Sequence, residues 1–217
     1  MEGLVCGFGD RNLSAPRQTL LLRQQVHGDR VVDARRVPRR TGPDASDGLA
    51  RLDVDADALV AAAPGIVVGV RTADCVPLLL IAPRTRWAAA VHAGWRGTLA
   101  GIAVAAVQQA ADAGVHPEEL LAALGPSIGP CCYEVSEELG GSFRQAGLHD
   151  ATTNPAAGRR PHLDLREANR RLLLRSGLLP EHLQLVGPCT RCASDRFHSF
   201  RAEPGSAGRQ VSWIGWR

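Results

Sequence analysis

Three short apolar runs carry the clearest structural signal of this chain: I-V-V-G-V (66–70), V-P-L-L-L-I-A (76–82) and W-A-A-A-V (87–91). Each run is continuous and is separated from the next by turn-forming or polar residues. Runs of this length and composition predict strands that are buried in the interior of a domain.

On the N-terminal side of these runs, residues 19–34 predict a strand, a turn at His27, Gly28 and Asp29, and a second strand. Residues 35–52 are rich in Arg, Pro, Gly and Asp, which predicts an exposed loop. The segment 56–63, A-D-A-L-V-A-A-A, predicts a short helix that Pro64 and Gly65 end.

On the C-terminal side, the apolar period changes at Thr98 and predicts a helix with Thr98 as N-cap and Gly114 as the stop. Residues 120–130 predict a strand that runs into a Gly/Pro loop. Ser136 opens a short helix, and Asp164 with Glu167 forms a capping box before an amphipathic helix. Closing strands are expected at 183–186 and 210–216. The pattern predicts one mixed α/β (α+β) domain over residues 1–217, with its unusual loops at strand ends.

The composition is that of a globular protein, with 217 residues, 45% apolar residues, 22% charged residues and a net charge of +3. The arginines are scattered, so nucleic acid is not an expected partner. The start of the chain does not resemble a signal peptide, and no apolar run reaches the roughly 18 residues that span a membrane. We therefore expect a cytoplasmic protein, whose cysteines are reduced and available as ligands or nucleophiles. The sequence indicates no oligomeric state.

His27, Cys75 and His92 are candidate metal ligands, because each lies at or beside a predicted strand end, where side chains from separate strands can converge. Two imidazoles and a thiolate suit Zn²⁺, and three protein ligands leave a fourth position open for water or substrate. Asp74 is a candidate catalytic residue that could orient a ligand histidine. The alternative is that these are ordinary surface or core residues, since they are far apart in sequence.

Arg96 is a candidate catalytic and phosphate-binding residue, because Gly94 and Gly97 bracket it at a predicted helix start. Free backbone N–H groups and a guanidinium there would favour an anion. The alternative is a tight strand-to-helix connection with Arg96 on the surface.

Four further cysteines form two pairs, the adjacent Cys131 and Cys132 and the C-x-x-C of Cys189 and Cys192. Together they could form a structural zinc site. Adjacent cysteines seldom both bind one zinc ion, however, and the spacing is not that of twin C-x-x-C motifs, which favours reduced cysteines without a metal.

Several motifs resemble one known family: Q-V-H-G (25–28), T-A-D-C-V-P-L-L-L (72–80), V-H-A-G-W-R-G-T (91–98) and G-P-S-I-G-P-C-C-Y-E-V (125–135). In this order and separation they are similar to the laccase-domain purine nucleoside phosphorylases, the YfiH-type group formerly labelled polyphenol oxidases. The ending, from C-T-R-C at 189–192 to the last strand, resembles that family as well.

The resemblance implies a YfiH-like fold, a single domain with mixed β-sheets flanked by helices, and a catalytic zinc ion on His27, Cys75 and His92. It implies phosphorolysis of adenosine, inosine, guanosine and methylthioadenosine, together with adenosine deamination. The implied partners are purine nucleosides and phosphate, without nucleic acid or membrane. Arg201 stands where the family often has paired arginines, which makes it a candidate anion contact.

Three alternatives remain open. A copper-dependent polyphenol oxidoreductase would also use two His and one Cys, but a blue-copper site usually adds an axial Met, and the one Met is Met1. A metal-free cysteine hydrolase would use Cys75 as nucleophile with a histidine as base. The third alternative is a zinc-stabilised protein without catalytic activity.

Overall fold

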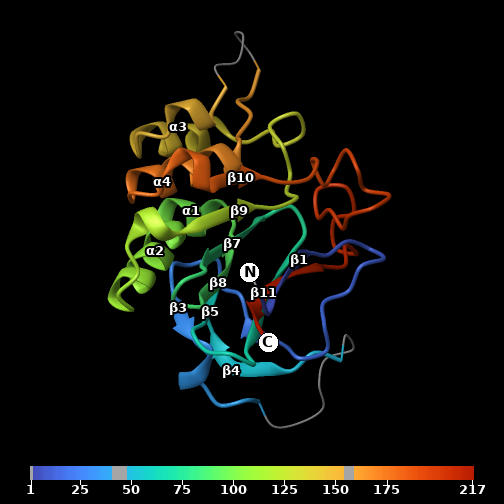
Figure 1. The fold of residues 1–217 in the computed structure, drawn as a ribbon. Coiled ribbons are helices and arrows are strands. Elements are labelled where there is room, and N and C mark those ends of the chain that lie inside the picture. The colour runs from blue at the N-terminus through green and yellow to red at the C-terminus, as the bar shows by residue number, and fades with distance from the viewer. Residues whose placement is uncertain (1, 41–47, 154–158) are drawn as a thin grey trace.

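The structure is a computed structural model that describes residues 2–40, 48–153 and 159–217. It consists of three layers, in which two β-sheets pack face to face and helices cover the outer face of one of them (Figure 1). It is one mixed α/β domain, as the sequence predicts.

The five-stranded sheet forms one outer layer, in the order β1-β11-β6-β2-β4. Its strands are β1 (Leu4–Phe8), β11 (Gln210–Trp216), β6 (Val67–Thr72), β2 (Thr19–Gln24) and β4 (Arg51–Asp55). Strand β2 runs parallel to both β4 and β6, whereas β11 is antiparallel to β1 and β6.

The six-stranded sheet is the middle layer, in the order β10-β9-β7-β8-β5-β3. Its strands are β10 (Leu183–Leu185), β9 (Leu121–Leu124), β7 (Val76–Ala82), β8 (Trp87–Ala93), β5 (Ala58–Ala61) and β3 (Val31–Asp33).

The helices pack on the face of the six-stranded sheet that points away from the other sheet. They are α1 (Trp95–Ala100), α2 (Ile102–Asp112), α3 (Glu137–Gln145) and α4 (Leu165–Arg175). Short 3-10 helices lie at η1 (Ala34–Arg36), η2 (Pro117–Glu119), η3 (His149–Ala151) and η4 (Pro180–His182). No helix in the described ranges is both long and apolar enough to cross a membrane.

The central strands β7 and β8 are apolar, apart from His92 near the end of β8, because each faces a hydrophobic core on both sides. In β7, Leu78 and Leu80 face the helices, whereas Leu79 and Ile81 face the five-stranded sheet. Every residue of both strands is buried. The buried strands predicted at 66–70, 76–82 and 87–91 are therefore confirmed as β6, β7 and β8.

The segment predicted as a helix at 56–63 is instead strand β5, so this prediction is wrong. All four residues of β5 are buried, and the strand pairs parallel to β3 and antiparallel to β8. A short continuous apolar run fits a buried strand as well as a helix, and pairing on both edges decides the outcome here.

Thr98 is not a helix N-cap. Helix α1 begins at Trp95 with Gly94 as its N-cap, and the left-handed Gly101 (φ 92°) separates it from α2. Thr98 is buried and accepts a hydrogen bond on its hydroxyl from Asn169 of α4 at 2.9 Å. Its role is therefore to join α1 to α4.

The loop predicted at 35–52 is only partly a loop. It contains the end of η1 and the start of β4, and its residues 41–47 lie outside the described residues. The helices expected after Ser136 and Asp164 are confirmed as α3 and α4, with those side chains accepting N-cap hydrogen bonds. The strands near 120–124, 183–186 and 210–216 are confirmed as β9, β10 and β11.

Candidate metal centre and nucleoside pocket

Strand register brings Cys75 and His92 to one end of the six-stranded sheet. Cys75 directly precedes β7, and the antiparallel pairing of Val76 with Ala93 places it next to the end of β8, where His92 lies. His27 arrives from the other sheet, on the connection between β2 and β3. The three residues, here called the His–Cys–His triad, meet where the layers adjoin.

The triad has the geometry of a metal site. The ligand atoms of its three members lie within 4.8 Å of one another. The two imidazole rings meet edge to face, with centroids 4.8 Å apart and an interplanar angle of 80°. In a tetrahedral zinc site with bonds of about 2.0–2.3 Å, neighbouring donors are roughly 3.3–3.8 Å apart, so small side-chain rotations would close the set. The donors therefore fit Zn²⁺ with one position left open.

Asp57 organises this centre, and the sequence analysis did not identify it. Its side chain is fully buried, and its carboxylate accepts a hydrogen bond from Nδ1 of His92 at 2.8 Å. The same carboxylate accepts from the backbone N–H groups of His27 at 2.9 Å and Gly28 at 2.7 Å. Because a carboxylate only accepts, Nδ1 of His92 carries a proton, and Nε2 is the nitrogen that would bind a metal after losing its own proton.

The charges within the triad stabilise one another. Burial raises the pKa of the Cys75 thiol, but hydrogen bonds from the rings of His27 and His92 outweigh this effect and lower it to about 6. Burial alone would lower the pKa of His92, because it disfavours the charged imidazolium. Interactions with Asp57 and Cys75 outweigh burial and raise this pKa to about 9. A thiolate is the form of cysteine that binds metals or attacks as a nucleophile, so Cys75 is prepared for either role.

Two glycines allow the segments of the centre to approach one another. A Cβ on Gly94 would lie 3.0 Å from Sγ of Cys75 and 3.1 Å from Cδ2 of His27. A Cβ on Gly97 would lie 2.8 Å from the carbonyl oxygen of Gly28. His27 (φ 62°) and Asp74 (φ 85°) both have left-handed backbones, a conformation that costs free energy and is concentrated at functional sites.

The triad opens into a cavity of about 780 Å³. Besides the triad, four arginines line the cavity: Arg71, Arg96, Arg201 and Arg209. Its aromatic and aliphatic lining residues are Trp95, Ile128, Tyr133, Leu165 and Phe200. Guanidinium groups favour anions, and apolar and aromatic surfaces favour planar rings. The size falls within the range of sites for small organic ligands.

Arg96 and Arg201 both line this cavity, although they come from different parts of the chain. Both therefore remain candidate anion contacts. Arg96 lies in the first turn of α1 and stacks on the Trp95 ring, with its guanidinium carbon 4.3 Å from the ring centroid. Arg201 stacks on Tyr133 at 5.1 Å and donates to the carbonyl oxygen of Glu134 at 3.1 Å. Helix α1 has only six residues, so the arginine side chains are the main source of positive charge.

Asp74 lies in the cavity lining but does not orient a histidine. Oδ1 accepts from the hydroxyl of Thr190 at 2.7 Å, and Oδ2 accepts from the backbone N–H of Arg201 at 2.7 Å. Asp74 therefore holds the C-terminal loop in place, and the partner of His92 is Asp57.

The two cysteine pairs come together, although their spacing did not favour it. The ligand atoms of four residues, here called the four-cysteine cluster, lie within 4.8 Å of one another: Cys131, Cys132, Cys189 and Cys192. All four are free thiols. The cluster is a second set of residues that could hold a metal ion.

Comparison with known proteins identifies the family. Residues 10–217 match the family described as multi-copper polyphenol oxidoreductase laccase. The chain belongs to this family, since the match covers almost its whole length.

Its relatives carry enzyme names. The chain is 39% identical to a purine nucleoside phosphorylase of Deinococcus radiodurans, over 88% of this chain and 68% of the relative. It is 40% identical to adenosine deaminase RL5 from an unknown prokaryotic organism, over 73% of this chain and 61% of that protein. The chain thus spans less than two thirds of the latter relative's length.

Solved structures show the same fold. The crystal structure of YlmD from Geobacillus stearothermophilus matches with a TM-score of 0.80 and 25% identity, over 100% of this chain and 93% of that one. The Bacillus licheniformis protein YfiH matches with a TM-score of 0.79 and 28% identity, over 95% and 77% of the two chains. The YfiH-like fold expected from the motifs is confirmed.

Proposed function

We propose that this chain is a zinc-dependent purine nucleoside phosphorylase. Its substrates would be adenosine, inosine, guanosine and methylthioadenosine, which react with phosphate to give the base and a ribose 1-phosphate. The observation that carries the proposal is the opening of a three-donor metal site into a cavity lined by arginines and aromatic rings. The names of its relatives support the same activity.

In this reaction an oxygen of phosphate bonds to C1′ of the ribose while the bond from C1′ to the purine nitrogen breaks. The base leaves with that electron pair and takes up a proton. A zinc ion on the triad would supply Lewis acidity next to the reacting groups. Arg96 and Arg201 would hold the phosphate, which turns an encounter of two solutes into a reaction within one complex.

The remaining lining residues would orient the nucleoside. The exposed ring of Phe200 offers a surface on which a purine can stack, whereas Arg96 already stacks on the Trp95 ring. Burial, followed by the negative charge of Cys75, raises the pKa of Tyr133 to about 12, so its hydroxyl keeps its proton. Tyr133 is thus a hydrogen-bond donor for a sugar or base oxygen at neutral pH.

Adenosine deamination is proposed as a slower second activity. Zinc deaminases move the proton with a glutamate in an H-x-E signature, and neither His27 nor His92 is followed by one. The H-P-E at 116–118 adjoins η2 and does not line the cavity. Among the described residues that line the cavity, Asp74 is the one carboxylate, and both of its oxygens already accept hydrogen bonds. A proton shuttle of the usual kind is therefore missing.

Two alternatives rest on specific observations. The thiolate of Cys75 beside two imidazoles also suits a cysteine hydrolase. The family description names copper, and two His with one Cys is a set that copper accepts. Zinc is favoured because a copper site of this type usually adds an axial Met, and the one Met of the sequence is Met1.

The test is chromatography of each nucleoside after incubation with zinc-loaded protein, with and without phosphate. We expect hypoxanthine from inosine only when phosphate is present, and slower conversion of adenosine to inosine. Absence of free base with a fully loaded metal site would overturn the phosphorylase proposal. Oxidation of a phenol by copper-loaded but not zinc-loaded protein would support the oxidoreductase, and hydrolysis by metal-free protein would support the cysteine hydrolase.

A further inference from the structure

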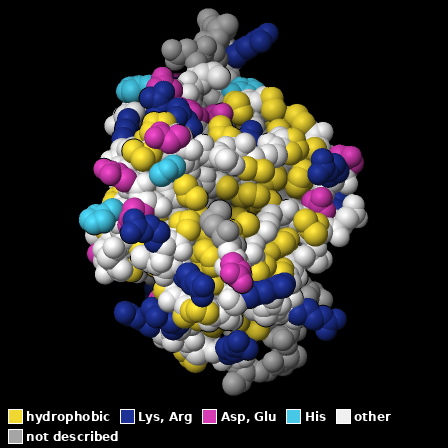
Figure 2. Space-filling view, viewed as in Figure 1, with side chains coloured by type: hydrophobic (Ala, Val, Ile, Leu, Met, Phe, Trp, Pro, Cys, Tyr) yellow, Lys and Arg dark blue, Asp and Glu magenta, His cyan; other side chains and the backbone are white. Residues whose placement is uncertain are grey.

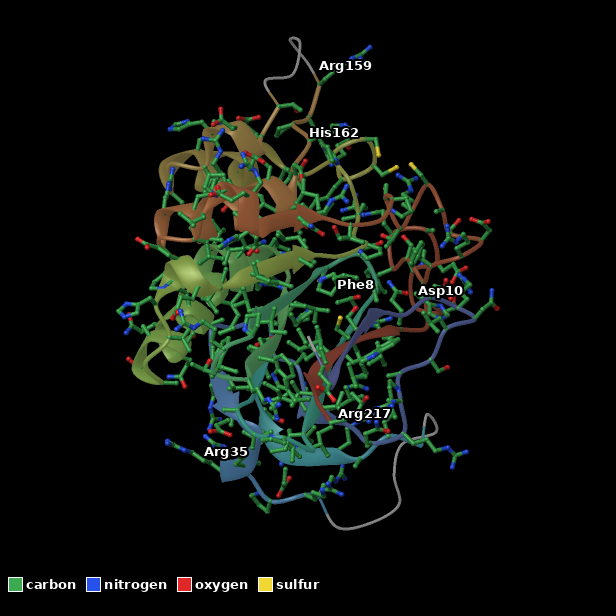
Figure 3. All side chains as sticks on the ribbon, in the orientation of Figure 1. Phe8, Asp10, Arg35, Arg159, His162 and Arg217 are labelled. Carbon is green, nitrogen blue, oxygen red and sulfur yellow. The ribbon has the colours of Figure 1, made fainter. Side chains whose placement is uncertain are left out.

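The four-cysteine cluster lies where two loops meet. One loop follows β9 and carries Cys131 and Cys132, and the other follows β10 and carries Cys189 and Cys192. The loops are paired, since the backbone N–H of Thr190 donates to the carbonyl oxygen of Ser127 at 3.0 Å. Figure 3 shows sulfur atoms gathered at this junction.

The sulfur atoms are spaced for a shared cation rather than for disulfides. Sγ of Cys192 lies 3.6 Å from Sγ of Cys131 and 3.4 Å from Sγ of Cys132. A disulfide bond would need about 2.05 Å. A tetrahedral zinc site with Zn–S bonds of about 2.3 Å has sulfur atoms roughly 3.8 Å apart, which is close to the observed spacing.

The backbone brings the two loops close together and offers one hydrogen bond to a cluster sulfur. The N–H of Gly129 donates to Sγ of Cys189 at 3.2 Å. A Cβ on Gly129 would lie 3.3 Å from Cβ of Cys189 and 3.4 Å from Sγ of Cys131, so glycine allows the loops to approach this closely. The turn from Gly129 to Cys132, closed by a 3.0 Å hydrogen bond, lets both adjacent cysteines face the same partner.

We propose that the four-cysteine cluster binds one zinc ion through four thiolates, as a structural site separate from the His–Cys–His triad. Each thiol gives up its proton on binding, and the four sulfurs complete the coordination shell without room for substrate. The site would fasten two loops that no disulfide joins.

These loops form one wall of the cavity, so a zinc ion that joins them would also hold that wall in position. Tyr133 follows the first cysteine pair, and Arg201 follows the second. Both loops are also anchored to Asp74, whose carbonyl oxygen accepts from Ile128 N–H at 2.9 Å and whose carboxylate binds Thr190 and Arg201. The cysteines would thus be positioning residues for this wall, and this part of the inference rests on the proposed function.

The first test needs no change within the cluster. The Cys75→Ala variant, which lacks a triad ligand, is stripped of metal under reducing conditions and alkylated with or without Zn²⁺, and modified cysteines are mapped by mass spectrometry. We expect zinc to protect the four cluster cysteines and to leave Cys6, which is exposed in β1, as reactive as before. Equal alkylation with and without zinc would overturn the proposal.

The second test identifies the donors. Co²⁺ is added to the full-length Cys75→Ala chain, where four thiolates would give intense sulfur-to-cobalt charge-transfer bands and tetrahedral ligand-field bands. Cys192→Ser should weaken and shift these bands, whereas the matched control Cys6→Ser should leave them unchanged. An identical spectrum in the Cys192→Ser chain would contradict the assignment.

Hydrogen exchange supplies the readout for positioning. Zinc added to the Cys75→Ala chain should slow amide exchange in residues 126–134 and 187–201, while strands β7 and β8 remain unchanged. No change in either loop would refute the positioning role. Because none of these measurements uses a nucleoside, an inactive enzyme with a zinc-binding cluster would refute the proposed function alone.

Discussion

The ligand atoms of the His–Cys–His triad and those of the four-cysteine cluster each lie within 4.8 Å of one another, but the two sets differ in their number of donors and in their place in the fold. The triad takes its donors from strand ends between the layers, and a buried carboxylate fixes one of them. The cluster takes its donors from two surface loops, and two of its cysteines are exposed. Three donors facing a cavity suit chemistry, whereas four thiolates facing one another suit structure. The number of donors and the space beside them thus separate the two roles.

The largest expected effect comes from removing a triad donor. Cys75→Ala or His92→Ala leaves two ligands, so the bound zinc should fall from about two ions per chain to about one, with phosphorolysis lost. Elemental analysis of folded protein measures the metal. Double substitution of Cys189 and Cys192 is the matched control, and it should remove the other ion instead. Wild-type zinc content in the triad variants would show that the triad does not bind one of the two ions.

Asp57→Asn should weaken zinc binding at the triad by roughly 10- to 100-fold. The amide keeps the shape of the carboxylate but loses the charge that holds His92 and the His27 backbone. Competition with a chelator measures the affinity. Asp55→Asn is the control, because Asp55 pairs with Arg23 on the surface and does not touch the triad. Equal affinities in the two variants would show that Asp57 does not support the metal.

Arg96→Ala should leave both metal sites loaded and reduce kcat/KM for phosphate by roughly 10- to 100-fold, the equivalent of a charge-assisted hydrogen bond of about 1.5–3 kcal/mol. Deamination uses no phosphate and should fall less. Steady-state rates of the two reactions give the ratio, and Arg84→Ala on the surface is the control. Equal losses in both reactions would indicate a structural role or direct contact with the nucleoside.

The smallest effects should come from two glycines that allow close approach. Gly94→Ala should lower zinc affinity at the triad a few-fold, because the added Cβ meets Sγ of Cys75 and the His27 ring. Gly129→Ala should weaken the cluster less, since its nearest contacts are longer. Chelator titration of each variant distinguishes the sites, with Gly141→Ala in α3 as the control. A Gly94→Ala effect at the cluster would contradict the geometry.

The sequence predicts the middle of the molecule well because β7 and β8 are apolar on both faces and cannot be mistaken for surface segments. It fails at β5, where a four-residue strand has no periodicity of its own and is defined by its neighbours. That error also hid Asp57, which was assigned to a helix. The one signal in the sequence was an aspartate next to an apolar run. The pairing of Ala58 with Val91 explains its role, because it places Asp57 beside His92.

The triad could be proposed from the sequence because each member adjoins a strand end. The sequence also suggested a zinc site at the four cysteines but favoured reduced cysteines without a metal, because the contact between Cys132 and Cys192 forms only where two irregular loops meet. The surface gives little guidance to function: Figure 2 shows acidic and basic side chains interspersed over the visible face. The scattered arginines of the sequence include four that share the cavity, and only the fold brings them together.

The proposed function requires that the metal held by the His–Cys–His triad serves phosphorolysis. The most direct measurement is the initial rate of hypoxanthine release from inosine and phosphate as zinc is titrated into metal-free wild-type and Cys75→Ala protein. We predict that the wild-type rate rises in proportion to triad occupancy, while Cys75→Ala binds zinc at the cluster and stays inactive. Phosphate-dependent release by Cys75→Ala at the wild-type rate would show that the triad metal does not serve phosphorolysis.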